Sequence, residues 1–312
     1  MDRNLAAHMA FYAMYAEDMF SSIKMTNPHG TPQLDAHVDY GPPLSGADWN
    51  IEGEIRCTDT LGILGTLFND LPFHFDTGEY FYGFLLKRRT PGGPVAVGDY
   101  VAIIRGTQLT AEWIMNTEIT MDPFALKTGV VAYVPRGFHT IYKSMVLVTP
   151  AGRAPAAAGI AQIVGNAKLS VVGHSLGSAL GTYLAYDLAT YPMPGGAKLN
   201  VYAWLFASPH PGDRNFSEGF YAAMPDYDVI NWDRDAVPQV PPLPYVPVPS
   251  VFQLTLDNVT IEPWNPVDLA CNHNLLSYAR MLDPTLVTSD PTGCFTPPKV
   301  ETAEVSTSTD TG

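Results

Sequence analysis

The sequence is short of basic residues, of cysteines and of long hydrophobic runs, and each shortage excludes a class of protein. Its 17 lysines and arginines face 31 acidic residues, which leaves a net charge of −14 at pH 7. That charge repels a nucleic-acid backbone or an anionic membrane surface. No apolar run approaches the roughly 20 residues that span a bilayer. We therefore expect no nucleic-acid partner and no integral membrane segment.

Cysteine is scarce, which excludes a disulfide scaffold. Cys57, Cys271 and Cys294 allow at most one bridge within the chain. Cys271 and Cys294 flank a C-terminal segment and could pair, although three buried thiols are the simpler interpretation. Cys271 stands two residues before His273, but no second ligand pair follows at a spacing typical of zinc sites. We expect no metal site.

Glycine-rich nucleotide-binding motifs are also absent, so we expect no cofactor. The first 20 residues, MDRNLAAHMAFYAMYAEDMF, place Arg3 beside Asp2 and His8 within the apolar stretch, without a small-x-small cleavage site. This pattern predicts no signal peptide in the sequence as written. The compartment stays open: the protein is cytoplasmic, or is secreted by a signal-independent or already processed route.

The composition that is present belongs to a globular protein. Of the 312 residues, 46% are hydrophobic and only 15% charged, which excludes wholesale disorder. The stretch 297–312 contains Thr, Ser, Glu and Pro without an aromatic residue, which is typical of a disordered tail. We therefore expect one folded domain over 1–296 and a disordered C-terminal tail over 297–312.

Hydrophobic patterning predicts strands that alternate with helices. Leu5, Met9, Tyr12, Ala16 and Phe20 lie at helical spacing and predict an N-terminal amphipathic helix. Strands are predicted at 79–89, 99–106, 129–134, 169–174, 199–208, 228–232 and 251–256, and helices at 154–167, 175–191 and 274–282. Such an alternation indicates a single α/β domain with a mostly parallel, doubly wound central sheet flanked by helices.

The composition of two segments predicts irregular structure. Residues 27–53 carry clusters of Pro, Gly and Asp and read as a connection. The stretch from Pro238 to Pro249, which we call the proline loop, holds six prolines in twelve residues and predicts an extended surface loop.

The strongest chemical motif is Gly173-His174-Ser175-Leu176-Gly177, a G-x-S-x-G pentapeptide. It follows the apolar run KLSVV and opens a leucine-rich helix, which is the context of a nucleophile elbow. In such an elbow Ser175 occupies a strained strand-to-helix turn, and the residues two positions away must be glycine to avoid crowding the backbone. The alternative is an ordinary turn with a helix-capping serine.

A serine nucleophile on an elbow needs a histidine and an acid later in the chain. Only His210 and His273 follow Ser175. His273 is favoured, because it lies on a late loop just before the final helix, where an imidazole can reach the top of the sheet.

Three aspartates compete for the acid: Asp213, Asp233 and Asp235. Asp235 ends the run DVINWDRD and precedes Ala-Val-Pro, where a strand gives way to its loop. Asp233 could point the same way. The alternative for Asp213 and Asp233 is a solvated loop carboxylate or a helix cap.

Five segments together resemble the class 3 lipase family, the fungal-type branch of the α/β-hydrolases. They are RGTQLTAEW (105–113), GHSLGSAL (173–180), ASPHPGDRNF (207–216), DRDAVPQVPP (233–242) and NHNLLSY (272–278). The resemblance runs from about Glu79 to Leu282 and implies the α/β-hydrolase fold. It also implies that Ser175 is the nucleophile, Asp235 the acid and His273 the base, with the backbone N–H groups of Thr107 and Leu176 as the oxyanion hole.

The resemblance further implies a short lid over roughly 108–116, which includes Trp113, Ile114 and Met115. These three residues could instead form a core-facing turn of helix. In the proline loop, Val240, Leu243 and Tyr245 could wall a substrate pocket or form part of a rigid cover.

The sequence thus predicts a serine carboxylester hydrolase, a triacylglycerol lipase in the first place, which works through an acyl-enzyme and contacts a lipid–water interface transiently. An esterase for soluble or aromatic esters is the alternative. A third alternative is a binding protein that has the hydrolase fold but no catalytic activity. Such a protein would be expected to lack a member of the triad.

Overall fold

The computed structural model describes residues 1–23, 26–27, 29–36, 41–42, 44–58, 78–106, 119–265 and 267–295 of the chain. The predicted oxyanion residue Thr107, the predicted lid residues Trp113, Ile114 and Met115, and the predicted tail 297–312 lie outside the described residues.

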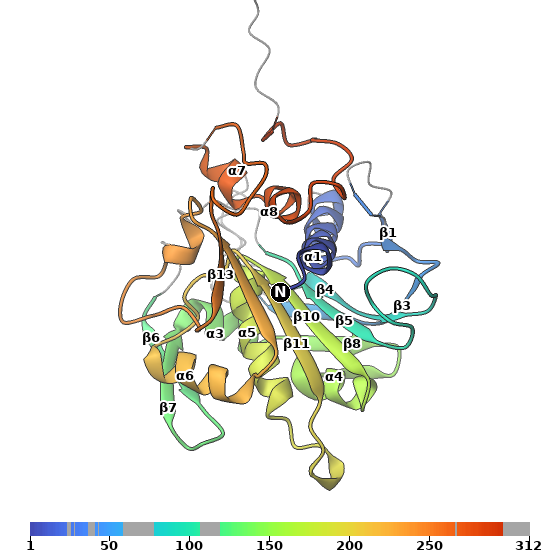
Figure 1. The fold of residues 1–312 in the computed structure, drawn as a ribbon. Helices are drawn as coiled ribbons and strands as arrows, with labels where there is room; N and C mark the ends of the chain where they lie inside the picture. Colours follow the sequence, from blue (N-terminus) through green and yellow to red (C-terminus); the bar gives the residue numbers. More distant parts are fainter. Residues whose placement is uncertain are drawn as a thin grey trace, which may run out of the picture.

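A nine-stranded sheet forms the centre of the fold (Figure 1). Its strand order is β13-β12-β11-β10-β5-β4-β3-β8-β9. The bounds are β3 Trp49–Thr58, β4 Glu79–Arg88, β5 Tyr100–Ile104, β8 Val146–Thr149, β9 Gly152–Pro155, β10 Lys168–His174, β11 Asn200–Phe206, β12 Tyr227–Trp232 and β13 Val251–Leu254. Within this part of the chain, the sheet carries the predicted strands 79–89, 99–106, 169–174, 199–208, 228–232 and 251–256.

The sheet is mixed, whereas the sequence predicted a mostly parallel one. Neighbouring strands from β13 to β5 are parallel, and those from β5 to β9 are antiparallel. The reason lies in the connections. The turn TPGGP is too short for a crossover between β4 and β5, and only antiparallel neighbours can be joined by so short a link.

Helices cover both faces of this sheet. Helix α5 packs on β10 and β11 and is flanked by α3, α4 and α6, whereas α1 packs on β10, β4 and β5 together with α8 (Figure 1). The bounds are α1 Arg3–Ile23, α3 Arg136–Lys143, α4 Ala156–Val164, α5 Leu176–Ala189, α6 Arg214–Ala223, α7 Leu269–His273 and α8 Leu275–Leu282. The helices predicted at the N-terminus, 154–167, 175–191 and 274–282 are present, whereas α3 and α6 were not predicted.

Helix α1 is buried more completely than the amphipathic stripe predicted. Twelve of its residues are buried, from Ala6 to Phe20, and they lie on all sides of the helix. The additional cover comes from segments before β4. The Tyr15 hydroxyl donates to the Pro42 carbonyl, and the Trp49 ring meets the Tyr12 ring edge-on at 5.5 Å. The segment predicted as an irregular connection therefore contains structure that encloses α1.

Short elements complete the fold. The predicted strand at 129–134 lies outside the central sheet: β7 Val131–Pro135 pairs with β6 Met121–Ala125 in a two-stranded ribbon, and Val131 is half exposed. Within the predicted connection, β1 Asp35–Ala36 pairs with β2 Leu44–Ser45. The short turns η2 Pro194–Gly196 and η3 Val237–Gln239 are 3₁₀ helices.

The proline loop is partly buried, which corrects the prediction of a surface loop. Tyr245 and Val248 are each only 2% exposed, whereas Leu243 is 83% exposed. Without backbone N–H groups at six positions the loop cannot join the sheet. It is held by its buried apolar side chains and by single hydrogen bonds, such as that from the Val246 N–H to the Gly212 carbonyl at 2.8 Å.

Cys271 and Cys294 form a disulfide, while Cys57 is a buried free thiol. The simpler interpretation of three thiols was therefore wrong. Trp264 further ties the chain near the disulfide to residues 293–294. Its backbone N–H donates to the Cys294 carbonyl at 2.9 Å, and its indole N–H donates to the Gly293 carbonyl at 3.0 Å. No helix among the described residues is long and apolar enough to cross a membrane.

Candidate functional site

Ser175 occupies a strained turn between β10 and α5. Its φ of 56° and ψ of −125° lie where non-glycine residues rarely occur. A Cβ on Gly173 would lie 2.2 Å from the Gly177 carbonyl oxygen, and one on Gly177 would lie 2.3 Å from the Ile104 carbonyl oxygen. Both contacts are impossible, so this turn requires glycine at each position. The geometry is that of a nucleophile elbow rather than of a capping serine.

The elbow is fixed to the neighbouring strand and to the following helix. The Ser175 N–H donates to the Phe206 carbonyl at the end of β11, at 3.0 Å. Leu176 is fully buried and is the first residue of α5. Backbone N–H groups in the first turn of a helix have no acceptor within the helix, and the helix dipole adds partial positive charge there. The N–H of Leu176 is therefore placed where an anion is favoured.

His273 and Asp235 form a buried pair. The two atoms His273 Nδ1 and Asp235 Oδ2 are 2.8 Å apart, and the residue Asp235 is only 2% exposed. The other carboxylate oxygen accepts the Val237 N–H at 2.9 Å. A carboxylate only accepts, so Nδ1 carries the proton and donates it, which leaves Nε2 as the basic nitrogen.

The other two candidate aspartates have different surroundings. Asp213 caps the N-terminus of α6, where its side chain accepts the Phe216 N–H at 2.9 Å. Asp233 is exposed and follows the end of β12. His210 contacts the proline loop, where its Nδ1 lies 2.7 Å from the Pro241 carbonyl oxygen. Since a carbonyl only accepts, this nitrogen is the protonated one.

Tyr278 is a member of the site that the sequence analysis did not assign. Its hydroxyl donates to Asp235 Oδ2 at 2.7 Å and accepts the Trp232 N–H at 3.0 Å. Burial and the neighbouring Asp235 charge raise the pKa of Tyr278 well above its ordinary value, so the hydroxyl keeps its proton. Its position at the end of the segment NHNLLSY was the available signal.

We expect Tyr278→Phe to lower kcat about tenfold, because the loss of one charge-assisted hydrogen bond costs Asp235 roughly 1.5 kcal/mol of orientation and stabilisation. The Trp232 N–H also loses its acceptor, so the midpoint of thermal unfolding should fall by several degrees. Steady-state kinetics and calorimetry measure the two effects. A variant with wild-type kcat would exclude Tyr278 from the support of Asp235.

His273 is linked to the elbow through His174, the residue that precedes Ser175. His174 Nε2 lies 3.0 Å from the His273 carbonyl oxygen, which ties the histidine backbone to the residue that precedes Ser175. The Ser175 hydroxyl and His273 Nε2 are both buried, and neither has a hydrogen-bond partner among the described residues. Each of the two atoms can therefore still take a hydrogen-bond partner.

The proposed pocket residues of the proline loop have different environments. Tyr245 is buried and its hydroxyl donates to the Ile119 carbonyl, so it anchors the loop. Val240 is partly buried against the core, and Leu243 points to solvent. Loop anchoring is thus the observed role of Tyr245, while a substrate contact by any of the three stays a prediction.

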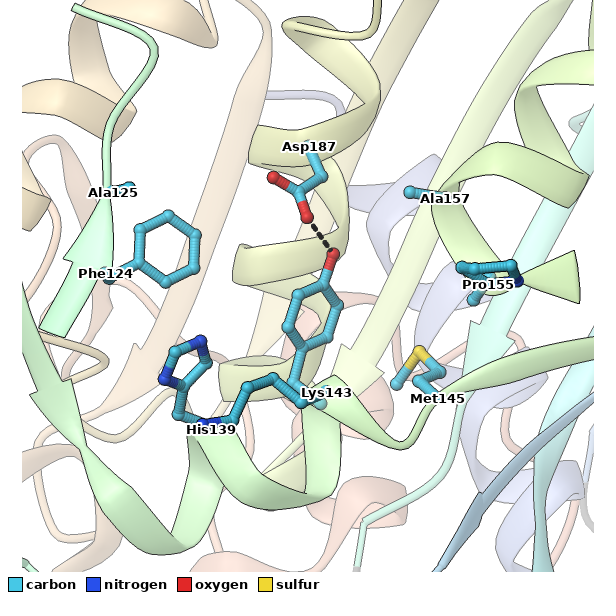
Figure 2. Close-up of a pocket in the computed structure, with 10 residues that line it drawn as sticks. Phe124, Ala125, His139, Lys143, Met145, Pro155, Ala157 and Asp187 are labelled. Atoms are coloured by element: carbon cyan, nitrogen blue, oxygen red, sulfur yellow. Dashed lines mark hydrogen bonds between the residues drawn. The ribbon is translucent and has the colours of Figure 1, made fainter. Parts of the chain in front are cut away.

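A separate pocket of about 320 Å³ is lined by residues of β6, α3, α4 and α5 (Figure 2). Asp187 on its wall accepts the Tyr142 hydroxyl at 2.6 Å, shown as the dashed line in Figure 2. Nearby, Asp122 joins His139 at 2.6 Å and Lys143 at 2.9 Å. Asp187 lies about 18 Å along α5 from Ser175, so this hollow belongs to the opposite end of the helix. Within the described ranges, no group of three His, Cys, Asp or Glu side chains could hold a metal ion.

Comparison with known proteins shows which family this chain resembles. Residues 101–245 match the model of the family described as Lipase (class 3). Phospholipase A1-II 7 of rice (Oryza sativa subsp. indica) is 30% identical over 218 residues, which cover 61% of this chain and 53% of that protein. Phospholipase A1-IIgamma of Arabidopsis thaliana is 27% identical over 202 residues, which cover 58% of this chain and 47% of that protein. The chain spans about half the length of these curated relatives.

Solved structures support the fold. A deletion mutant of the Rhizomucor miehei lipase in its propeptide complex has a TM-score of 0.50 at 16% sequence identity, covering 89% of this chain and 77% of that chain. The predicted α/β-hydrolase fold is confirmed, and so is the resemblance stated from the five motifs. The chain thus has the α/β-hydrolase fold, and its residues 101–245 resemble the class 3 lipase family.

Proposed function

We propose that this protein is a serine hydrolase that cleaves carboxylic esters of lipids, with Ser175, His273 and Asp235 as its triad. The single observation that carries the proposal is the strained elbow, which holds Ser175 next to the residue that contacts the His273 backbone. Backbone strain of this kind persists only where the surrounding structure enforces it, and it concentrates at functional sites.

The triad residues have distinct tasks in the proposed reaction. His273 Nε2 takes the proton of the Ser175 hydroxyl as its oxygen attacks the ester carbonyl, and the same proton then passes to the departing alcohol. Asp235 keeps the proton of His273 on Nδ1 and stabilises the imidazolium that forms. Water repeats the sequence on the acyl-enzyme, which releases the carboxylic acid and returns the proton to Ser175.

Two backbone N–H groups, those of Leu176 and Thr107, are proposed to bind the oxyanion. The Leu176 N–H is proposed because it lies at the start of α5, where it has no acceptor within the helix. Thr107 follows Gly106 directly, and its assignment to the oxyanion hole comes from the family resemblance.

Replacing Thr107 tests the oxyanion hole. Thr107→Pro removes the N–H and should cost about 3 kcal/mol of transition-state stabilisation, roughly a 100-fold fall in kcat. Thr107→Ser keeps both the N–H and a hydroxyl and should be mild, so it is the matched control. Undiminished turnover by the proline variant, measured in steady-state kinetics, would remove Thr107 from the hole.

Triacylglycerol is the first proposed substrate, in keeping with the family. Phospholipid is a second candidate, because the curated relatives from rice and Arabidopsis are phospholipases A1. Both substrates present a carboxylic ester to the same triad, so they differ only in how the loops accept the alcohol part. Release of fatty acid from a triacylglycerol emulsion and from phosphatidylcholine vesicles, compared at equal ester concentration, decides between them.

A lid over roughly 108–116 is proposed to give interfacial activation. Apolar residues such as Trp113 can cover a pocket in water and move onto an oil surface, which offers them an equivalent environment. The rate on a short-chain ester should then rise sharply where the substrate exceeds its solubility. The net charge of −14 should make anionic surfaces weaker activators than neutral ones, and salt should narrow the difference.

A smooth saturating curve without a break at the solubility limit would instead favour an esterase for soluble esters. Trp113→Ala is the matched test of the lid, with a larger expected loss on emulsified long-chain esters than on soluble short ones. A profile across p-nitrophenyl esters of increasing chain length supplies the acyl preference. Absence of turnover on all of them would favour a binding protein without catalysis.

A further inference from the structure

A partly buried carboxylate on α1, that of Glu17, reaches the elbow from the N-terminal helix. Glu17 Oε1 lies 2.8 Å from His174 Nδ1 and also accepts the Gly106 N–H at 3.0 Å. The side chain of His174 is only 4% exposed and that of Glu17 15%. One oxygen atom of an N-terminal helix therefore contacts the residue before the proposed nucleophile and the residue before the proposed oxyanion residue Thr107.

The opposite nitrogen of the same ring holds the proposed base. His174 Nε2 lies 3.0 Å from the His273 carbonyl oxygen, and the two imidazole rings lie 4.7 Å apart between centroids. The contacts thus form a continuous path from Glu17 through His174 to the backbone of His273.

The acceptors on both sides fix the protons of His174. A peptide carbonyl only accepts, so Nε2 carries a proton. Glu17 Oε1 already accepts from Gly106, and it is a carboxylate oxygen, so Nδ1 carries a proton as well. Burial disfavours the charged ring, but the Glu17 charge and hydrogen bond, the Asp235 charge and the His273 carbonyl together raise the pKa of His174 above its ordinary value.

Other charged and titratable groups surround this pair. Asp235 and the Tyr278 ring face His174 from the other side, and the Tyr278 ring centroid is 6.4 Å from that of His174. Arg105 is buried next to Glu17, stacked 3.7 Å above the Phe20 ring. Its guanidinium donates to the Gly106 carbonyl at 2.8 Å, so Gly106 is held at its N–H by Glu17 and at its carbonyl by Arg105.

We propose that Glu17 and His174 are a positioning pair for the proposed hydrolase, in which one carboxylate of α1 sets both the entry to the oxyanion hole and the backbone of His273. This inference rests on the proposed function. Glu17 and His174 touch neither the substrate nor the reacting atoms, and act through Gly106 and His273. Displacements of about 1 Å in a catalytic group can cost roughly 100-fold in rate, so a small shift at either end suffices.

Glu17→Gln isolates the charge at constant shape. The neutral amide no longer favours two protons on His174. A single proton on Nδ1 turns the Nε2 lone pair toward the His273 carbonyl, whereas a single proton on Nε2 weakens the contact with position 17, so one end of the path is displaced in either case. We expect kcat to fall about 10–100-fold with KM changed less than about twofold, because positioning acts on the transition state. Glu218→Gln, on the exposed face of α6, is the matched control and should keep wild-type kinetics.

Two further readouts separate positioning from general stability. In Glu17→Gln, His174 gains its second proton only at acidic pH, so the ratio of variant to wild-type kcat should rise as the pH falls. Dividing by the wild-type value cancels the pH effects that both proteins share. The loss in the double variant Glu17→Gln/His174→Gln should be smaller than the product of the single losses, because the residues act as one unit.

Nitrogen-15 NMR of histidine-labelled protein tests the pair without any substrate. We expect one ring, absent from the spectrum of His174→Gln, to carry protons on both nitrogens at neutral pH. Failure of the wild-type protein to cleave esters would contradict the proposed function and leave this spectrum to judge the pair. A singly protonated His174, or a folded Glu17→Gln protein whose kcat and pH ratio match wild type, would overturn the inference.

Discussion

Ser175→Ala should lower the rate of ester hydrolysis by about four to six orders of magnitude, the range in which a catalytic serine acts. The variant loses only the Oγ atom that attacks the carbonyl. The Ser175 hydroxyl makes no hydrogen bond with the described residues, so its removal breaks no observed contact. The measurement is initial-rate kinetics on a soluble p-nitrophenyl ester.

The serine variant has a structural control in the elbow itself. Thermal unfolding of Ser175→Ala should match wild type or exceed it, because the alanine keeps the same backbone and no satisfied polar contact is lost. Activity above a tenth of wild type, with the substituted sequence verified by mass spectrometry, would rule out Ser175 as the nucleophile.

His273→Ala should be nearly as damaging as the serine change, since a serine without its base is not activated and the two residues act as a unit. Asp235→Asn should cost about 10⁴-fold, because an amide can accept from or donate to His273 Nδ1 and so no longer fixes the tautomer. The pair His273–Asp235, at 2.8 Å and with Asp235 2% exposed, is the observation behind both expectations.

Asp213→Asn and Asp233→Asn are the matched controls for the acid. Asparagine also caps helices well, so Asp213→Asn should retain both activity and the capped start of α6. Asp233 is exposed, and its change should alter kcat less than about twofold. If Asp213→Asn lost the most activity of the three aspartate variants, the assignment of Asp235 would be wrong.

The local parts of this site could be predicted because local chemistry dictates them. Ser175 has a glycine two positions away on either side, and it lies between an apolar strand and a leucine-rich helix. A serine in this context has few conformations other than the elbow observed. Chain order favoured His273 over His210, whereas the choice of Asp235 among the three aspartates came from the resemblance to the class 3 lipase family. The structure pairs the chosen histidine with the chosen aspartate.

The long-range contacts could not be predicted, because nothing in the sequence near either partner encodes them. Glu17 and His174 are 157 residues apart, and Glu17 looks like one polar position on an amphipathic helix. The same holds for Tyr278, whose role depends on reaching Asp235 across 43 residues. The prediction of a mostly parallel sheet was wrong for a related reason. The apolar runs identify strands, but the direction of a pair such as β4 and β5 depends on the length of the connection between them.

Covalent labelling of the wild-type protein by a fluorophosphonate, with the modified peptide mapped by mass spectrometry, tests the central claim most directly. Such a reagent traps a serine activated by a neighbouring base and leaves ordinary serines unmodified. The account predicts one adduct per chain, on Ser175, together with loss of esterase activity, and slow or absent labelling of His273→Ala. An adduct at another residue, or no adduct in protein that hydrolyses esters, would contradict it.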